Sequence, residues 1–158
     1  MQVDQDSPGI SFPPPFIFLG VLALGLMIDR VSWWPMRLPL GNWLEDRLGW
    51  IAVIAGAVII LTALGLFKRA GTDSKPWKAS SALVTSGVYR WTRNPMYLGM
   101  ALIYAGIAIC ADSVITLLLL VPVVVVIQRD VILREEAYME SRFGAEYLAY
   151  CARVRRWF

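Results

Sequence analysis

Residues 48–67 read LGWIAVIAGAVIILTALGLF, a run of twenty residues without a charged side chain. A helix of about twenty apolar residues is what crosses the hydrocarbon core of a bilayer. The run also carries Ala52 and Gly56, which share one helix face and would let a neighbouring helix approach closely. The stretch therefore predicts a transmembrane helix that packs against another helix.

The composition of the whole chain is that of a membrane protein. Of its 158 residues, 58% are hydrophobic and 17% are charged, and the mean hydropathy is +0.57. A soluble domain carries about 25% charged residues, so this chain has too little polar surface for one. Its length corresponds to a single domain, residues 1–158.

Two kinds of partner are not expected. The net charge of +3 comes from side chains that lie between apolar blocks, without the basic face or reading motif that nucleic acid requires. The chain has no histidine and two cysteines, Cys110 and Cys151. Because a zinc site takes about four ligands, we expect no metal centre.

Three further apolar blocks complete the membrane part. Residues 16–28 follow a run of prolines, and their helix could begin near Ile10. Residues 95–111 and 113–128 are separated only by Asp112. One unbroken helix over both blocks would be about 50 Å long, more than a bilayer requires. These blocks therefore predict a tight helical hairpin.

The predicted fold class is all-α: a polytopic membrane protein with about four transmembrane helices, a helical hairpin and a C-terminal amphipathic cytoplasmic helix. The last helix follows the hairpin, and Gly144 is placed to end it. Residues 30–47, rich in Trp and mixed charge, predict a connector along the headgroup layer. Residues 10–67 would form the two N-terminal spans, and residues 68–158 the loop, the hairpin and the C-terminal helix.

The distribution of charge predicts the orientation. Residues 68–93 carry six Lys or Arg side chains against a single Asp, which places this loop in the cytoplasm. The basic tail, residues 153–158, suits an anionic membrane surface on the same side. Four spans satisfy both clusters and put the N- and C-termini in the cytoplasm. Because residues 1–6 lack the positive start of a secretory signal, we expect an integral protein of a prokaryotic inner membrane.

Two polar clusters lie close to membrane depth, where polar groups are costly and often functional. The first is residues 87–99, GVYRWTRNPMYLG. Pro95 fixes the start of a helix, so free backbone donors gather there and can bind an anion. Tyr89, Trp91 and Tyr97 offer aromatic faces to a flat ring or a cation. The alternative is an interfacial belt that only anchors the helix.

The second cluster is Arg134, Glu135 and Glu136, just past the hairpin. Adjacent side chains point about 100° apart on a helix, so one carboxylate can face a given pocket. It could bind an ammonium or sulfonium group, while the other pairs with Arg134 or a basic side chain of the loop. The alternative is a solvated charged face.

Residues 89–99, YRWTRNPMYLG, resemble the Arg-His-Pro-x-Tyr-x-Gly segment of isoprenylcysteine carboxyl methyltransferases. Their Asn-Pro-Met-Tyr form is even more similar to phosphatidylethanolamine N-methyltransferases. Glu135, Glu136 and the segment 143–150, FGAEYLAY, follow in the order of this family. The resemblance covers residues 80–157 and implies an integral membrane methyltransferase without a Rossmann domain. Consistently, the sequence has no Gly-x-Gly-x-x-Gly motif.

The resemblance implies S-adenosylmethionine as the cofactor and S-adenosylhomocysteine as the product. The implied methyl acceptor is lipophilic: a phospholipid amine, a prenyl-type carboxylate or a hydrophobic small molecule such as a thiol. By position, the resemblance assigns backbone contacts to Ser81, Ala82, Leu83 and Val84; cofactor contacts to Tyr89, Asn94, Pro95, Met96 and Tyr97; the methionine ammonium or ribose to Glu135; and catalytic support or acceptor orientation to Arg93 and Glu136.

Asn94 departs from the histidine usual in the carboxyl-methylating branch, and asparagine cannot act as a base near neutral pH. This favours the lipid-methylating branch. Two other function classes are compatible with the sequence. One is a membrane reductase of the sterol type that uses NADPH, since its C-terminal half is similar in architecture. The other is a non-catalytic membrane scaffold. Thermal stabilisation by the cofactor distinguishes the three.

Overall fold

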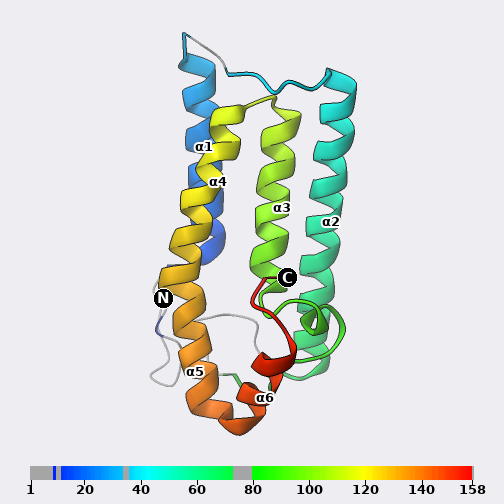
Figure 1. Ribbon diagram of the computed structural model, residues 1–158, viewed down its shortest axis with the longest axis vertical. Coiled ribbons are helices and arrows are strands. Elements are labelled where there is room, and N and C mark those ends of the chain that lie inside the picture. Colours follow the sequence, from blue (N-terminus) through cyan, green and yellow to red (C-terminus); the bar gives the residue numbers. More distant parts are fainter. Residues whose placement is uncertain (1–8, 10–11, 34–35, 73–79, 158) are drawn as a thin grey trace.

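The computed structural model describes residues 9, 12–33, 36–72 and 80–157, and within these ranges it contains helices and no strand. Four helices stand side by side and run alternately up and down (Figure 1). The predicted all-α class is confirmed. The four helices are α1, Pro14–Val31; α2, Asn42–Arg69; α3, Pro95–Cys110; and α4, Val114–Val126.

The fourth helix continues without a break beyond the bundle. A π-helical turn, η2 (Ile127–Ile132), joins α4 to α5 (Leu133–Phe143), so that Val114–Phe143 is one rod of 30 residues. Gly144, with a φ of +52°, ends the rod at the predicted place. The short helix α6 (Ala145–Arg153) then packs against α5. A 3₁₀ turn, η1 (Gly87–Arg90), precedes α3.

Three of the described helices are long and apolar enough to cross a membrane: α1, α2 and the rod Val114–Phe143. α3 is apolar but has 16 residues. At 1.5 Å per residue it is about 24 Å long, shorter than the roughly 30 Å hydrocarbon core. The chain thus has the helices of an integral membrane protein, and the count of four spans stays a prediction.

Some predicted features lie outside the described residues. These are the acidic residues 1–6, the helix start near Ile10, and Lys75 and Lys78 of the basic loop. The described edges of that loop lie at one end of the bundle, where α2 ends and α3 begins (Figure 1). They carry Lys68, Arg69, Arg90 and Arg93.

The helix α2 starts earlier than its apolar run indicates. Its first residue is Asn42, so residues 43–47, which we expected along the headgroup layer, form its first turns instead. Arg47 lies over the Trp43 ring, 4.1 Å from the centroid. This i,i+4 contact depends on helical geometry. Glu45 in the first turn also complements the helix dipole, so local contacts extend the helix past the apolar residues.

The turn between α3 and α4 lies where the sequence predicted it. Asp112 adopts a φ of +50°, a left-handed conformation in which Asp and Asn are enriched. Its carboxylate accepts a 2.7 Å hydrogen bond from Leu38 N and lies 3.5 Å from Arg37 Nη1. The turn is thereby held to the connection between α1 and α2.

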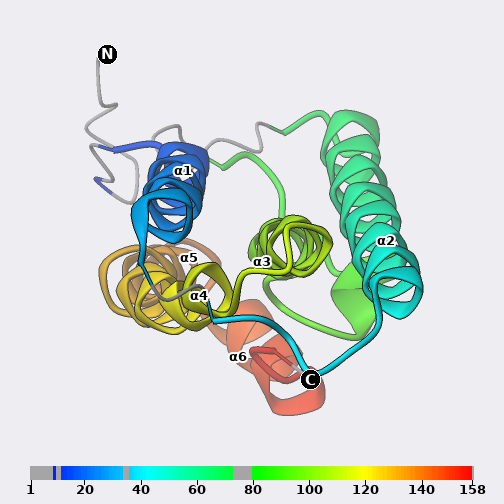
Figure 2. The ribbon, with the colours of Figure 1, turned by 90° about the horizontal axis from the view of Figure 1, so that it is seen from above.

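Glycines bring α2 and α3 into direct contact. The antiparallel helices place Gly56 against Gly99 and Gly49 against Gly106. A Cβ atom on Gly56 would lie 2.5 Å from the Gly99 carbonyl oxygen, so no side chain fits between the backbones. Small residues permit such close van der Waals packing between membrane helices. The other side of α3 contacts α1 and α4 (Figure 2), which makes α3 the central helix.

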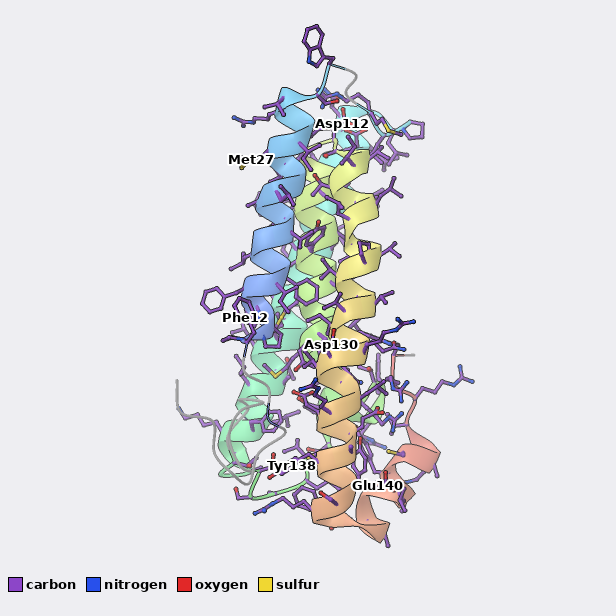
Figure 3. All side chains as sticks on the ribbon, turned by 90° about the vertical axis from the view of Figure 1, so that its left-hand side faces the viewer. Phe12, Met27, Asp112, Asp130, Tyr138 and Glu140 are labelled. Carbon is purple, nitrogen blue, oxygen red and sulfur yellow. The ribbon has the colours of Figure 1, made fainter. Side chains whose placement is uncertain are left out.

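The surface of the bundle is apolar in its middle. The outer face of α2 exposes Trp50, Ile54 and Leu61, as expected for a helix in contact with lipid chains. Of the polar side chains labelled in Figure 3, Asp112 lies at one end, Tyr138 and Glu140 lie at the other, and Asp130 lies between them, near the level of Phe12. This distribution suits a bundle whose middle lies in hydrocarbon and whose ends lie in water.

Replacing Gly56 with Leu should force α2 away from α3, because the new side chain would meet the Gly99 carbonyl. Overpacking of this kind costs about 1–3 kcal/mol of unfolding free energy. We expect a lower thermal unfolding midpoint for the detergent-purified variant. Gly65 lies on the same helix, and a Cβ atom there meets nothing within 4 Å. Gly65→Leu is therefore the matched control, and equal midpoints for the two variants would contradict the contact.

Candidate functional site

The junction between the loop and α3 is built by Thr92, Asn94 and Pro95, all of which are buried. Pro95 is the first residue of α3, where its missing N–H costs no hydrogen bond. Asn94 N donates to Thr92 Oγ1 at 3.2 Å, and Asn94 Nδ2 donates to the Arg156 carbonyl at 3.1 Å. The side chain of Asn94, expected at the cofactor, is thus directed to the C-terminal tail.

Tyr97 lies in the first turn of α3 and is buried. Its hydroxyl donates a 2.6 Å hydrogen bond to Glu135 Oε1, short as is usual when the acceptor is a carboxylate. Its neighbour Met96 packs instead against the cluster that contains Val84 and Tyr89. The start of α3 therefore presents Tyr97 to α5 and Met96 to the loop.

Glu136 is bound by two arginines from distant parts of the chain. Arg93 Nη2 lies 3.2 Å from Glu136 Oε1. Arg156 donates from Nε at 3.0 Å and from Nη2 at 2.6 Å to the two carboxylate oxygens, a bidentate pair. These hydrogen bonds raise the pKa of Arg156. Of the partners predicted for this carboxylate, the loop supplies Arg93, whereas Arg134 is exposed.

The assignment of the whole basic tail to the membrane surface is wrong for Arg156. Its guanidinium turns inward to Glu136. The physical reason is that a carboxylate removed from water requires a positive partner. Glu136 and its partner Arg93 have side chains only 16% and 15% exposed. Arg153 and Arg155 of the same tail are exposed.

The adjacent Glu135 and Glu136 face different neighbours, as helix geometry predicts. Two arginines neutralise Glu136. Within the described part of the chain, Glu135 forms a hydrogen bond with Tyr97 and no ion pair. Charges removed from water are paired as a rule, so Glu135 is the carboxylate of this group that lacks a cation.

Tyr89 lies on the loop side of the site. It is buried, and its ring meets Phe67 edge-on with 5.6 Å between the centroids. Its carbonyl accepts a 2.7 Å hydrogen bond from the Tyr150 hydroxyl of α6. Burial, and secondarily the charge of Glu135, raise the pKa of Tyr89. Its hydroxyl is therefore a neutral donor in the neighbourhood of that carboxylate.

The segment 80–84 runs between the end of α2 and the helices α5 and α6. Ser81 N donates to Thr72 Oγ1 at 2.9 Å, so this amide, expected at the cofactor, has a partner within the protein. The backbone groups of residues 82–84 form no hydrogen bond within the described ranges. Ala82 and Leu83 are half-buried and Val84 is buried, so a ligand is one source of partners for these groups. Leu83 and Val84 use their side chains for packing against the buried tyrosines around them.

The structure brings the predicted residues together in two contacts, Tyr97 with Glu135 and Arg93 with Glu136. A site prediction from sequence omitted the residues that hold these contacts in place. The sequence offered no local signal for them, because their partners lie at least 20 residues away along the chain. The described residues contain no cluster of metal-ligating side chains, and the expected lack of a metal centre stays a prediction. The omitted residues are Thr92, Gln128, Tyr150, Arg156 and Trp157.

Residues 45–146 match the phospholipid methyltransferase family. The chain belongs to this family. The match runs from the first turn of α2 through the hairpin to the start of α6, so it contains Tyr97 and both carboxylates and ends before Arg156. The family predicted from the sequence is confirmed, and it supports a membrane methyltransferase as the class of protein.

Two relatives extend the comparison. An uncharacterised protein of Haemophilus influenzae is 39% identical over 62 residues, which make up 39% of this chain and 98% of that protein. Protein-S-isoprenylcysteine O-methyltransferase A of Arabidopsis thaliana is 28% identical over 115 residues, 72% of this chain and 58% of the plant protein. The match thus spans less than two thirds of the plant protein. No solved structure matches the chain significantly.

Proposed function

We propose that this protein transfers a methyl group from S-adenosylmethionine to a lipophilic acceptor at the cytoplasmic face of a membrane. Glu135 carries the proposal, because the partner of this half-buried carboxylate is the neutral hydroxyl of Tyr97. A carboxylate in such surroundings suits a cationic ligand. The ammonium group of the methionine part would supply the charge, and the ribose hydroxyls are the alternative donors.

Further groups around Glu135 fit the rest of the cofactor. The backbone groups of residues 82–84, which have no hydrogen bond among the described residues, offer donors and acceptors. Ser81 holds the segment to Gly71 and Thr72, which follow α2. Tyr89 and Tyr97 offer aromatic rings and hydroxyls, and the turn 94–96 fixes their spacing. These groups suit a ligand with a flat ring, hydroxyls and a cation. When bound, S-adenosylmethionine supplies a methyl group on a positively charged sulfur.

Arg93 and Glu136 would orient the acceptor. Arg93 Nε is buried and has no hydrogen-bond partner among the described residues, so it has a donor left for a phosphate or carboxylate. A carboxylate or thiolate acceptor needs no base, and its alignment with the methyl group supplies much of the rate. An amine acceptor must lose a proton, for which a Glu carboxylate or water is the sink, since Asn94 cannot take it.

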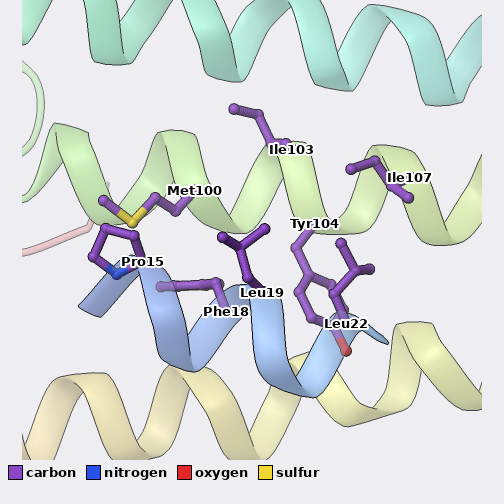
Figure 4. A pocket seen from close by; sticks show the side chains of 8 residues that line it. All are labelled: Pro15, Phe18, Leu19, Leu22, Met100, Ile103, Tyr104 and Ile107. Atoms are coloured by element: carbon purple, nitrogen blue, oxygen red, sulfur yellow. The ribbon is translucent and has the colours of Figure 1, made fainter. Parts of the chain in front are cut away.

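An apolar groove between α1 and α3 supports a lipophilic acceptor (Figure 4). Its volume is about 190 Å³, and its one polar side-chain group, the Tyr104 hydroxyl, is already bonded to the Thr116 carbonyl. Met100 at one end lies three residues after Tyr97, about 4.5 Å along the helix axis. A lipid chain in this groove would bring its polar end toward Tyr97. The lining residues are Pro15, Phe18, Leu19, Leu22, Met100, Ile103, Tyr104 and Ile107.

Our proposal for the topology has both termini in the cytoplasm and four spans. These are the three long apolar helices and the shorter helix α3. The up-and-down order of the helices and the basic residues at the ends of α2 and η1 support this orientation. Neighbouring helices shield α3 on two sides, so its length of 16 residues suffices if the bilayer thins or its ends extend into the headgroups. The prokaryotic inner membrane stays a prediction.

Calorimetric titration of the detergent-purified protein with S-adenosylhomocysteine tests the cofactor. We expect saturable binding that weakens about tenfold or more in Glu135→Ala, the loss typical of a hydrogen bond to a charged group. Glu140→Ala removes an exposed carboxylate from the same helix and should bind like the wild type. If the folded wild type binds NADPH and not S-adenosylhomocysteine, the methyltransferase proposal is wrong and a reductase replaces it.

Filling the groove tests the acceptor. Leu19 and Leu24 are both exposed residues of α1, and of the two Leu19 lines the groove. We expect Leu19→Trp to reduce transfer of labelled methyl groups into a membrane lipid extract several-fold, because the larger Trp side chain would extend into the groove. Its affinity for S-adenosylhomocysteine should not change. Leu24→Trp should keep full transfer. Equal transfer by the two variants would show that the groove does not bind the acceptor.

A reporter that is active only in the cytoplasm, fused after Phe158, tests the orientation. We expect an active fusion, because the two spans α3 and α4 return the chain to the side of the basic loop. The same reporter inserted at residue 41, between α1 and α2, is the control and should be inactive. The reverse pattern in fully inserted fusions would contradict the topology.

A further inference from the structure

Arg156 contacts two elements of the site with two different groups. Its carbonyl oxygen accepts hydrogen bonds from Thr92 Oγ1 at 2.9 Å and from Asn94 Nδ2 at 3.1 Å. Its guanidinium forms the bidentate pair with Glu136 on α5. One residue therefore bridges the turn that begins α3 and the rod that carries both carboxylates.

The neighbours of Arg156 hold the tail in one register. The Arg155 carbonyl accepts a 3.0 Å hydrogen bond from Arg93 N, on the loop side. Trp157 Nε1 donates to Gln128 Oε1 at 2.9 Å, on the rod. Contacts on both sides of Arg156 thus fix which residue of the tail faces Glu136.

We infer that Arg156 is a positioning residue: it ties the start of α3 to the carboxylate pair and so sets the geometry of Tyr97 and Glu135. Its effect on cofactor binding rests on the proposed function. We call the contacts of Arg156 with Thr92, Asn94 and Glu136 the tie. These contacts are within the folded protein and need no cofactor.

The guanidinium of Arg156 acts on Glu136 through its positive charge and through the fixed geometry of its two hydrogen bonds. Two carboxylates on adjacent residues repel each other unless cations neutralise them. Without this guanidinium, Glu136 would keep the single 3.2 Å contact with Arg93. The first turn of α5 would then be held to the start of α3 by fewer contacts, and the 2.6 Å hydrogen bond between Tyr97 and Glu135 depends on how these two segments are placed.

The test compares Arg156→Ala, Arg156→Lys and Arg153→Ala in the detergent-purified full chain. Arg153 is the matched control for the loss of one tail charge, because it is exposed and its Nε bonds to the Ala149 carbonyl of its own helix. Replacing the Arg156 side chain leaves the carbonyl that Thr92 and Asn94 bind. The comparison therefore isolates the guanidinium.

Hydrogen–deuterium exchange measures the tie without any cofactor. We expect Arg156→Ala to raise amide exchange in segments 92–98 and 133–138, since local opening follows the loss of contacts between them. Arg153→Ala should leave both segments at the wild-type level. Arg156→Lys keeps the charge without the planar fork and should exchange at an intermediate rate. Equal exchange in Arg156→Ala and Arg153→Ala would overturn the inference.

Titration with S-adenosylhomocysteine then measures the consequence for the site. Arg156→Ala should weaken binding about tenfold, and Arg153→Ala should not. In a Glu136→Gln background, Arg156→Ala should add little further loss, because the guanidinium acts through that carboxylate. An undiminished further loss would overturn the positioning role. If exchange reveals the tie but the wild type binds no S-adenosylhomocysteine, the proposed function fails and the tie stands.

Discussion

The close approach of α2 and α3 is the contact on which the other features of this protein depend. Lipid chains are as apolar as leucine side chains, so membrane helices associate through tight packing, and glycines on both helices provide it here. Because α3 also contacts α1 and α4, its position determines where the hairpin turns and where the rod begins. The first turn of α3 carries Tyr97, two residues before Gly99, so the glycine contact with α2 helps to fix the position of Tyr97.

The site itself is organised by a balance of charge. Arg93 and Arg156 both pair with Glu136, so two cations surround one carboxylate. Glu135 is next to this group in the sequence but is bonded to a neutral tyrosine. Adjacent residues of the same type thus have different surroundings, and the difference follows from the 100° rotation between successive helical residues. One carboxylate is bound by two arginines, and the other has a neutral hydroxyl as its partner.

Features set by local rules could be predicted from the sequence. The turn at Asp112 followed from the length of the apolar blocks, and the end of α5 followed from Gly144. The family and the polar clusters followed from short strings of residues. The continuous rod through η2 could not be predicted, because no periodicity in the sequence marks a π-helical turn. The inward turn of Arg156 also escaped prediction, since its partner Asn94 lies 62 residues away and its charge alone suggested a membrane surface.

The continuous rod has a consequence for depth. Glu135 lies 21 residues after Val114, the first residue of the rod, which corresponds to about 32 Å along its axis, close to the roughly 30 Å thickness of a hydrocarbon core. In the proposed topology the Asp112 turn lies at one membrane surface, and this length would place Glu135 near the opposite boundary between lipid and water. The length of the rod would then set the depth of this carboxylate in the bilayer.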